Sequence, residues 1–517
     1  MSETKRIRKR APSVFGTVIA VAIALLITFF SPNLIRAQAQ DTSGAVDYYK
    51  ATETADLNKQ IDALSKGYGS YMDNYKASAK GAGADVSIKA IFGQGLLKLL
   101  GTEDLKSIEA SVLSMQTDKK SKSIISLAAN DQTFTTLNML MDTDKELAYI
   151  LIPELSKAYL KLSTNPYDEL SGSMAFTPFT AKQLTDFLNN NPLTEELLNK
   201  LLKKYTSIVI NEVNDVTVAG SDKVIAGNVS ANYTKLIVKI DEETALSIGE
   251  KVLTTAKEDK DLLNLLVAFK LCSKSEYNSR IQETLDFIEK KKADIPEDGT
   301  GKEAVLTMNV YVDDKGNITG RDFSFEDNSE KINTLSFGYK TAKKDSDIGF
   351  DAWFTENGKD DFNLSGKVNA AETGVSGDIT FTYNDPYSER PEDIHIKLED
   401  VKYTADGVGG YLNGSFKLTG DSLSGLSIGA EYSGNTEQQT MKMDFDQSGE
   451  NLLSLIVKAK SIPYVDFKLP SKSAQIYDAE TQITEYLSTA DLNGYLKGIN
   501  SNINVKAIND YLALLIE

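Results

Sequence analysis

From about residue 304 to residue 460 the sequence alternates between apolar and polar residues at period two, in one short segment after another. Turn-forming pairs such as Asn357-Gly358 and Ser448-Gly449 separate the segments. This pattern predicts about ten successive antiparallel strands, each with one face exposed to solvent and one face covered. A sheet of that length buries its apolar face by curling against helices, a second sheet or a ligand. The apolar positions are Leu335/Phe337/Tyr339, Ile348/Phe350/Ala352/Phe354, Ile379/Phe381/Tyr383, Ile394/Ile396/Leu398, Leu426/Ile428/Ala430/Tyr432, Met441/Met443/Phe445 and Leu453/Leu455/Val457/Ala459.

Earlier parts of the chain mix strands with helices. Apolar residues at three-to-four spacing predict a helix within residues 44–80, and the small residues of 77–84 predict a linker. One long strand is expected over Val224–Ile240, followed by Asp241 as a helix N-cap and by three helices that reach about Lys292. Further strands are predicted at Ser107–Met115, Ser123–Ala129, Phe134–Met141 and Glu146–Ile152, and further helices at Ala181–Tyr205, Asp478–Ile499 and Val505–Ile516.

The predicted fold class is α+β, with an N-terminal transmembrane helix followed by long curved antiparallel β-meander sheets packed with amphipathic helices. The expected domains are a cytoplasmic basic stub with a transmembrane signal-anchor (1–36), a helical stalk or packing helix (37–84), a strand-rich domain with helices (85–298), an antiparallel β-meander (299–470) and C-terminal amphipathic helices (471–517).

The N-terminus determines the predicted location. Five basic residues within positions 5–10 precede 18 uncharged, mainly apolar residues from Ser13 to Phe30. This order predicts that the N-terminus is cytoplasmic and that most of the chain lies on the outer side of the cell membrane. The length of the apolar run favours a retained single-pass anchor. Pro32 and the small-x-small sequence Ala37-Gln38-Ala39 leave cleavage and secretion open as the alternative.

The net charge limits the possible partners of the chain, and the cysteine content limits its possible disulfides. The 517 residues carry a net charge of −18, and after residue 36 there are 50 bases against 73 acids. This surface repels nucleic acid, so no nucleic-acid partner is expected. The single cysteine, Cys272, excludes an intramolecular disulfide, and its apolar surroundings predict a buried small side chain.

No catalytic, metal or cofactor site is predicted. The only histidine, His395, alternates out of phase with Ile394 and Ile396, so it is expected on the exposed side of its strand. One histidine and one cysteine leave little for zinc or nucleophilic chemistry. Asp444 to Asn451 is similar to the first half of a calcium loop, but Leu455 stands where a bidentate Glu is needed, which favours a hairpin turn. With 74 acidic residues, an acid pair of the glycosidase type stays open.

Residues Asp142 to Lys161 have the rhythm of a strand pair. Over about residues 85–240 the chain resembles lipoprotein-carrier-like (LolA-like) half-barrels, a resemblance that implies a curved sheet around an apolar cavity and transfers no site residue. The overall plan also resembles uncharacterised membrane-anchored surface proteins of Gram-positive anaerobes.

These observations predict a non-enzymatic, membrane-anchored cell-surface protein that acts as a structural or interaction domain, with an unidentified protein partner. One alternative is a carrier-like protein for an apolar ligand or lipid, which requires a dry cavity of several hundred Å³, on the order of a small-molecule pocket, lined by Leu, Ile, Phe and Met. A second alternative is an acid-pair hydrolase.

Overall fold

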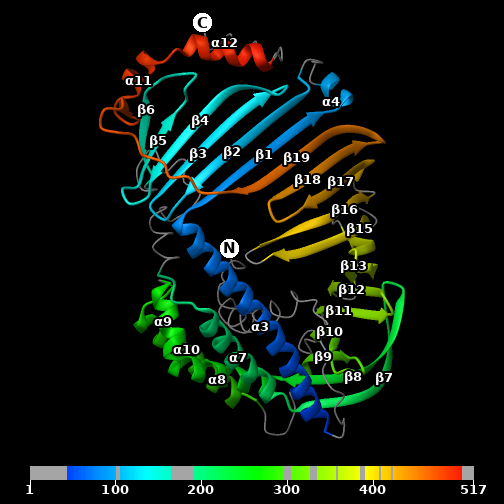
Figure 1. Cartoon of the computed structure of the whole chain (residues 1–517). Coiled ribbons are helices and arrows are strands. Elements are labelled where there is room, and N and C mark those ends of the chain that lie inside the picture. The colour runs from blue at the N-terminus through cyan, green and yellow to red at the C-terminus, as the bar shows by residue number, and fades with distance from the viewer. Residues whose placement is uncertain are drawn as a thin grey trace, which may run out of the picture. The chain divides into compact units, whose positions relative to one another are not determined.

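The computed structural model describes residues 44–99, 105–164, 190–269, 271–295, 304–325, 335–356, 359–384, 391–406, 409–420 and 423–503 (Figure 1). These residues form 20 strands and 8 helices, which confirms the β-rich character of the chain. Contacts divide the chain into two compact units. Unit 1 comprises Met1–Ser70, Pro192–Ala370 and Ile379–Glu392, and unit 2 comprises Tyr71–Asn191, Ala371–Asp378 and Asp393–Glu517.

Helix α3 (Ala45–Lys80) confirms the predicted N-terminal helix. The predicted linker over residues 77–84 is wrong, because the helix continues to Lys80 and strand β1 (Ala82–Phe92) begins two residues later. The glycine that suggested a linker has a packing role instead. A Cβ atom on Gly83 would lie 2.8 Å from the carbonyl oxygen of Ile462, so a larger residue would separate two paired strands.

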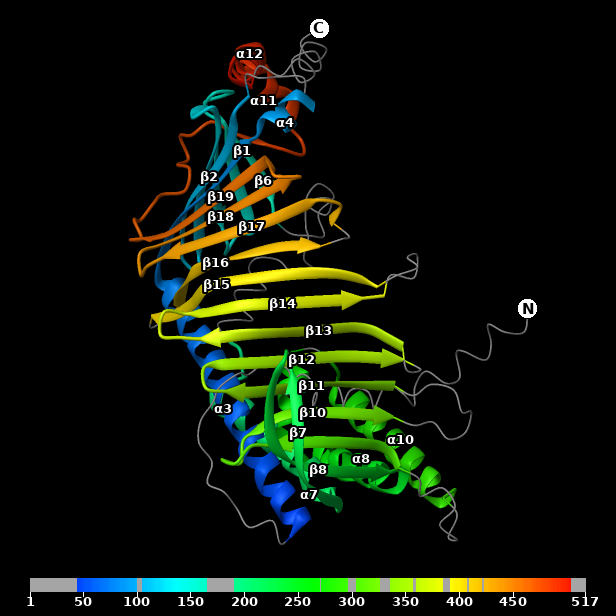
Figure 2. The same ribbon diagram turned by 90° about the vertical axis from the view of Figure 1, so that its right-hand side faces the viewer.

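Unit 1 is built on an antiparallel meander in which each strand pairs with the next (Figure 2). The predicted single strand Val224–Ile240 is wrong, because Gly227 and Asn228 have φ values of 49° and 63° and form a two-residue turn between two strands. The strands are β7 (Asp215–Ala226), β8 (Val229–Asp241), β9 (Ala304–Val312), β10 (Ile318–Phe325), β11 (Leu335–Lys344), β12 (Asp347–Glu356) and β13 (Lys359–Ala370), and β14 (Val375–Tyr383) has residues in both units.

The tip of the β7–β8 hairpin folds onto the face of β12 and β13, where two glycines allow backbone to touch backbone. A Cβ atom on Gly349 would lie 1.8 Å from the carbonyl oxygen of Ala226, and one on Gly227 would lie 1.7 Å from that of Gly366. The backbone N–H of Gly227 donates to Oδ1 of Asp351 at 3.1 Å, which holds the tip in place.

The core of unit 1 lies between the start of α3 and the sheet. Tyr48 and Tyr49 of α3 pack on Leu236, Val238 and Val310, all of them buried. The other four helices of the unit pack mainly on one another. Asp241 caps α8 through its side chain, as predicted. The helices are α7 (Glu195–Glu212), α8 (Glu242–Glu258), α9 (Lys260–Ala268) and α10 (Lys274–Ala293), and residues 181–189 of the predicted Ala181–Tyr205 helix lie outside the described residues.

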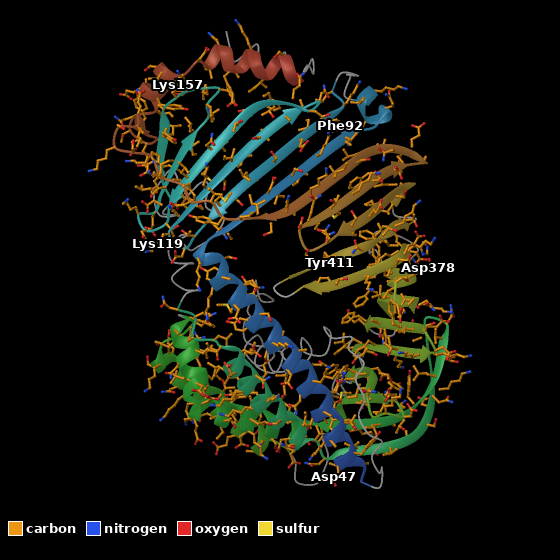
Figure 3. The ribbon with its side chains drawn as sticks, viewed as in Figure 1. Asp47, Phe92, Lys119, Lys157, Asp378 and Tyr411 are labelled. Atoms are coloured by element: carbon orange, nitrogen blue, oxygen red, sulfur yellow. The ribbon has the colours of Figure 1, made fainter. Side chains whose placement is uncertain are left out.

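Unit 2 is a twelve-strand sheet in which β1 is central, because it pairs with β2 on one side and with β19 on the other. The pairings are antiparallel except for β20, which runs parallel to β6. Phe92 and Lys119 mark opposite ends of the central strands (Figure 3). In spatial order the strands are β20 (Ile476–Asp478), β6 (Tyr159–Ser163), β5 (Leu147–Leu151), β4 (Gln132–Asp142), β3 (Lys120–Ala129), β2 (Ser107–Gln116), β1, β19 (Glu450–Ile462), β18 (Gln438–Gln447), β17 (Leu426–Gly434), β16 (Gly409–Gly420) and β15 (Glu392–Asp406).

Among the described residues, unit 2 contains the end of α3 after Ser70 and the helices α4 (Gln94–Leu99), α11 (Ile483–Thr489) and α12 (Leu492–Ile503). The predicted Asp478–Ile499 helix is therefore two helices, separated at Ala490, while the predicted Val505–Ile516 helix lies outside the described residues.

The predicted fold class needs correction. It placed a transmembrane helix at the N-terminus, but none of the helices in the described part of the chain is long and apolar enough to cross a membrane. The apolar run from Ser13 to Phe30, on which that prediction was based, lies outside the described residues. The expectation of sheets packed with helices is also wrong for much of unit 2, where strands β15–β18 have no helix in extensive contact among the described elements.

Candidate functional site

One face of the unit 2 sheet is apolar from strand to strand, and the residues that line it follow from the pairing register. We call the cross-strand line through the middle of this face the central row. Each member stands opposite the next: Thr135 on β4, Leu127 on β3, Ala110 on β2, Ile88 on β1, Val457 on β19, Met441 on β18 and Tyr432 on β17. Parallel rows beside it contain Val112, Val86, Leu455, Met443 and Phe416.

This apolar face is only partly covered. Ile88, in the middle of β1, is 49 % exposed, whereas Thr135 at one end of the central row is 8 % exposed. The other members of the row are partly buried, because large side chains on adjacent strands shield one another. A monomeric protein rarely exposes a contiguous apolar surface of this kind unless something binds to it. The face is therefore the strongest candidate for a binding surface.

Helix α12 shows how a chain segment packs on this face. The hydroxyls of its Tyr495 and of Thr135 share a hydrogen bond of 2.9 Å, and Leu496 is buried. The backbone N–H of Asp491, just before the helix, donates to the carbonyl oxygen of Leu155 at 2.9 Å. The helix contacts β4 and β3 (Figure 1). Helix α12 therefore covers the β4 end of the central row.

On β15–β18 the opposite face of the same sheet is polar. A hollow of about 270 Å³ lies on β15–β18 and is lined mainly by charged and small residues, including Lys417, Gly429 and Glu431. Ion pairs border it, Lys397 to Glu399 and Lys442 to Asp444, each at 2.8 Å. A second hollow, of about 550 Å³, is lined by Lys76, Ala79, Lys80, Thr117, Asp118 and Lys119. Neither has the Leu, Ile, Phe and Met lining that an apolar cavity requires.

The most deeply buried charges lie in unit 1. The side chain of Arg321 on β10 is 2 % exposed, and its Nη2 lies 2.8 Å from Oε2 of Glu53 and 2.8 Å from Oδ2 of Asp56, both on α3. Its Nε donates to Oε1 of Glu53 at 3.2 Å, and its Nη1 donates to the Tyr339 hydroxyl at 2.7 Å. Gln60 donates to the same Asp56 oxygen at 2.8 Å. All five side chains lie where α3 crosses the sheet.

Burial alone would lower the pKa of Arg321, but the charges of Glu53 and Asp56 outweigh it and raise the pKa above its ordinary value. The guanidinium therefore stays charged, and its donors are engaged by carboxylates and a hydroxyl. An arginine engaged by two carboxylates and a hydroxyl does not bind a substrate without breaking these bonds, so we assign the cluster to fastening α3 on the sheet. Sequence reasoning missed it. The available signal was an arginine in phase with Phe323 and Phe325 on an inward strand face.

A second polar cluster joins the helices of unit 1. Asp259 caps α9 by accepting from the backbone N–H groups of Asp261 and Leu262, and its other oxygen accepts from Lys204 at 2.7 Å and from the Tyr205 hydroxyl at 3.1 Å. Burial and the Asp259 charge raise the pKa of Tyr277 to about 12, so this tyrosine stays neutral.

Acid is expected to destabilise this cluster. Burial by itself would raise the pKa of Asp259, but the bonds from Lys204, the Leu262 backbone and Tyr205 outweigh it and hold the pKa below its ordinary value. A carboxyl with a depressed folded-state pKa adds stability above its unfolded pKa and loses it as the pH falls through the folded pKa. Asp259→Asn should therefore destabilise unit 1 by about 1–2 kcal/mol at pH 7. Urea denaturation at pH 7 and at pH 3 should show a smaller gap between parent and variant in acid, and an unchanged gap would contradict this role.

The residues singled out in the sequence lie apart. His395 is exposed on β15, in the predicted orientation. Cys272 is partly buried against the α8–α10 cluster and follows the end of α9. Ser448 and Gly449 have positive φ values and form the β18–β19 turn, which confirms the hairpin interpretation of that segment. Among the described residues no group of three or more His, Cys, Asp or Glu side chains could hold a metal ion.

Comparisons with known proteins give no family. No family model and no curated protein matches the chain. Among solved structures, OccK2 (OpdF) of Pseudomonas aeruginosa is 8 % identical over 74 % of this chain and 97 % of that one, with a TM-score of 0.14. OccK5 (OpdH) of the same organism is 8 % identical over 75 % and 98 %, with a TM-score of 0.12. Similarity this slight assigns neither a shared fold nor a function.

Proposed function

We propose that this chain is a non-enzymatic, extracytoplasmic interaction protein that binds an amphipathic helical segment of a protein partner on the apolar face of unit 2. The observation that carries the proposal is the half-exposed Ile88 in a row whose far end is already covered by α12. The extracytoplasmic location rests on the basic cluster and apolar run within residues 5–30, which have the order of an export signal.

Two properties indicate the chemistry of the partner: the apolar side chains of the central row and the acidic charge of the protein around it. The central row offers Leu, Ile, Val and Met side chains without a formal charge, which suits apolar residues at helical spacing. The protein around it is acidic, with a net charge of −18, so a partner helix with a neutral or basic outer face is favoured. The rings of Phe416 and Tyr432, whose centroids lie 6.0 Å apart and whose planes are tilted by 33°, provide an aromatic end to the surface.

The test uses a labelled 18-residue amphipathic peptide of Leu, Gln and Ala with no net charge, titrated with the full chain and followed by fluorescence anisotropy. We expect saturable binding that Met441→Asp weakens by about tenfold or more, because it places an unpaired charge in the contact. Thr440→Asp, the neighbouring residue on the opposite face of β18, is the matched control and should leave binding unchanged. Equal weakening by both variants, or no saturable binding by the parent, would overturn the proposal.

A second candidate, carriage of an apolar ligand or lipid, is favoured by the same half-exposed apolar face, although the face lies open rather than around a cavity. The protein should be purified without detergent and extracted with organic solvent for mass spectrometry. A lipid that co-purifies at about one molecule per protein chain would support the carrier function. A clean extract from folded protein would remove this candidate.

A further inference from the structure

We infer that unit 2 binds the phosphate group of a small soluble molecule in the hollow between the end of α3 and the β2–β3 turn. We call this site the lysine hollow. Its lining residues all belong to unit 2: Lys76, Ala79, Lys80, Thr117, Asp118 and Lys119. The hollow lies beyond the last residue of β2, whereas the central row crosses that strand at Ala110. The inference therefore goes beyond the proposed function and does not rest on it.

Hydrogen bonds fix the backbone around the lysine hollow. Figure 3 shows Lys119 at the end of the central strands, where α3 also ends. The backbone N–H of Asp118 donates to the carbonyl oxygen of Ala79 at 2.9 Å, which joins the turn to the helix. Within the turn, the Thr117 hydroxyl accepts from the backbone N–H groups of Lys119 at 3.3 Å and of Lys120 at 3.2 Å. A backbone fixed in this way lowers the ordering cost of binding a ligand.

The lysine hollow is basic in an acidic protein. Three lysines against one aspartate give its lining a net charge of +2, in a chain whose net charge is −18. All three lysines are exposed, and within the part of the chain that the structure describes none of them forms an ion pair. The next residue, Lys120, is paired with Asp466 at 2.7 Å. The turn therefore neutralises one of its two lysines and leaves the other available to an anion.

The end of the helix explains only part of this arrangement. Lys80 is in the last turn of α3, where the negative end of the helix dipole favours a cation. Lys76 precedes it by four residues, and like charges at that spacing destabilise a helix. Lys119 comes from the β2–β3 turn, so the helix dipole does not account for it. A bound anion stabilises all three charges together.

Charge and size favour a phosphate group. A phosphate monoester carries about 1.5–2 negative charges at pH 7 and three acceptor oxygens, which suit a net charge of +2 and three ammonium donors. The volume of about 550 Å³ is that of a small-molecule site. An extended anionic surface such as a membrane would also meet the acidic remainder of the protein and be repelled. The expected ligand is therefore a soluble phosphate compound.

The experiment titrates the full chain with inorganic pyrophosphate at pH 7 and low ionic strength, followed by isothermal titration calorimetry. We expect saturable binding of about one pyrophosphate per chain, which Lys119→Gln and Lys80→Gln each weaken by about tenfold or more, because a hydrogen bond between charged groups is lost. Lys98→Gln is the matched control. Lys98 is also exposed and in the last turn of a helix, α4, but it lies outside the hollow, so the affinity should not change.

Two results would overturn the inference: no saturable binding by the parent chain, or equal weakening by Lys119→Gln and Lys98→Gln. A second measurement tests whether the ligand is soluble, by co-sedimentation with vesicles of phosphatidylcholine with and without phosphatidic acid. We expect phosphatidic acid to add nothing to the protein found with phosphatidylcholine alone. An increase that Lys119→Gln abolishes would overturn the assignment to a soluble compound in favour of a lipid headgroup.

Discussion

Arg321→Ala is expected to destabilise unit 1 by about 3–5 kcal/mol, the usual cost of removing one partner from a buried ion pair. The loss comes chiefly from Glu53, which is 4 % exposed and would be left in the core without its counter-ion. Urea denaturation followed by the fluorescence of Trp353, the only tryptophan and a residue of β12, reports this unit directly.

Two comparisons show whether the buried charge is responsible. Lys251→Ala removes a lysine whose side chain is 58 % exposed in its pair with Glu212, and should change stability by no more than about 1 kcal/mol. Arg321→Met combined with Glu53→Leu replaces the more deeply buried of the two ion pairs by apolar side chains and should recover part of the loss. An Arg321→Ala variant that lost less than the Lys251 control would refute the assigned fastening role.

Gly349→Ala is expected to cost about 3 kcal/mol, at the upper end of the usual range for overpacking. The new methyl group would lie 1.8 Å from the backbone oxygen of Ala226, so the tip of the β7–β8 hairpin would have to leave the face of β12. Hydrogen exchange should accelerate around Gly227, whose N–H is bonded to Asp351. Gly429→Ala is the matched control, because a Cβ atom at that strand glycine meets nothing within 4 Å. It should be neutral or stabilise by about 0.5–1 kcal/mol. A stable Gly349→Ala variant would mean that the tip is not held against β12.

Local signals predicted the elements whose chemistry lies within a few residues. Asp241 was identified as a helix cap because an Asp before an amphipathic run satisfies free backbone N–H groups, and it does so here. The Ser448-Gly449 turn was found because both residues accept positive φ between two alternating segments.

One local turn and the elements that depend on distant partners were missed. The Gly227-Asn228 turn was read as part of a continuous strand, although the same turn rule applied to it. Strand β1 was read in part as a linker because Gly81 and Gly83 suggested a flexible segment, and its need for glycine arises from Ile462, far along the chain. Arg321 and Glu53 are 268 positions apart, so no local pattern could pair them.

From the sequence, the proposed binding surface was predictable only as an apolar strand face, without its position in the sheet. Alternation at period two shows that one face of a strand is apolar, but it does not show what covers that face. The central row became identifiable only through the register, since a shift by one residue would move Ile88 and Val457 to the polar side.

The central place of β1 has a consequence for the order in which the molecule is assembled. A chain is synthesised from its N-terminus at about 5–20 residues per second, so β1 exists for on the order of tens of seconds before β19 can pair with it. During that time Ile88 and its strand present an unpaired edge, the kind of surface on which polypeptides aggregate. Holding chaperones should therefore matter more to the yield of this protein than to that of a meander whose strands pair only with their sequence neighbours.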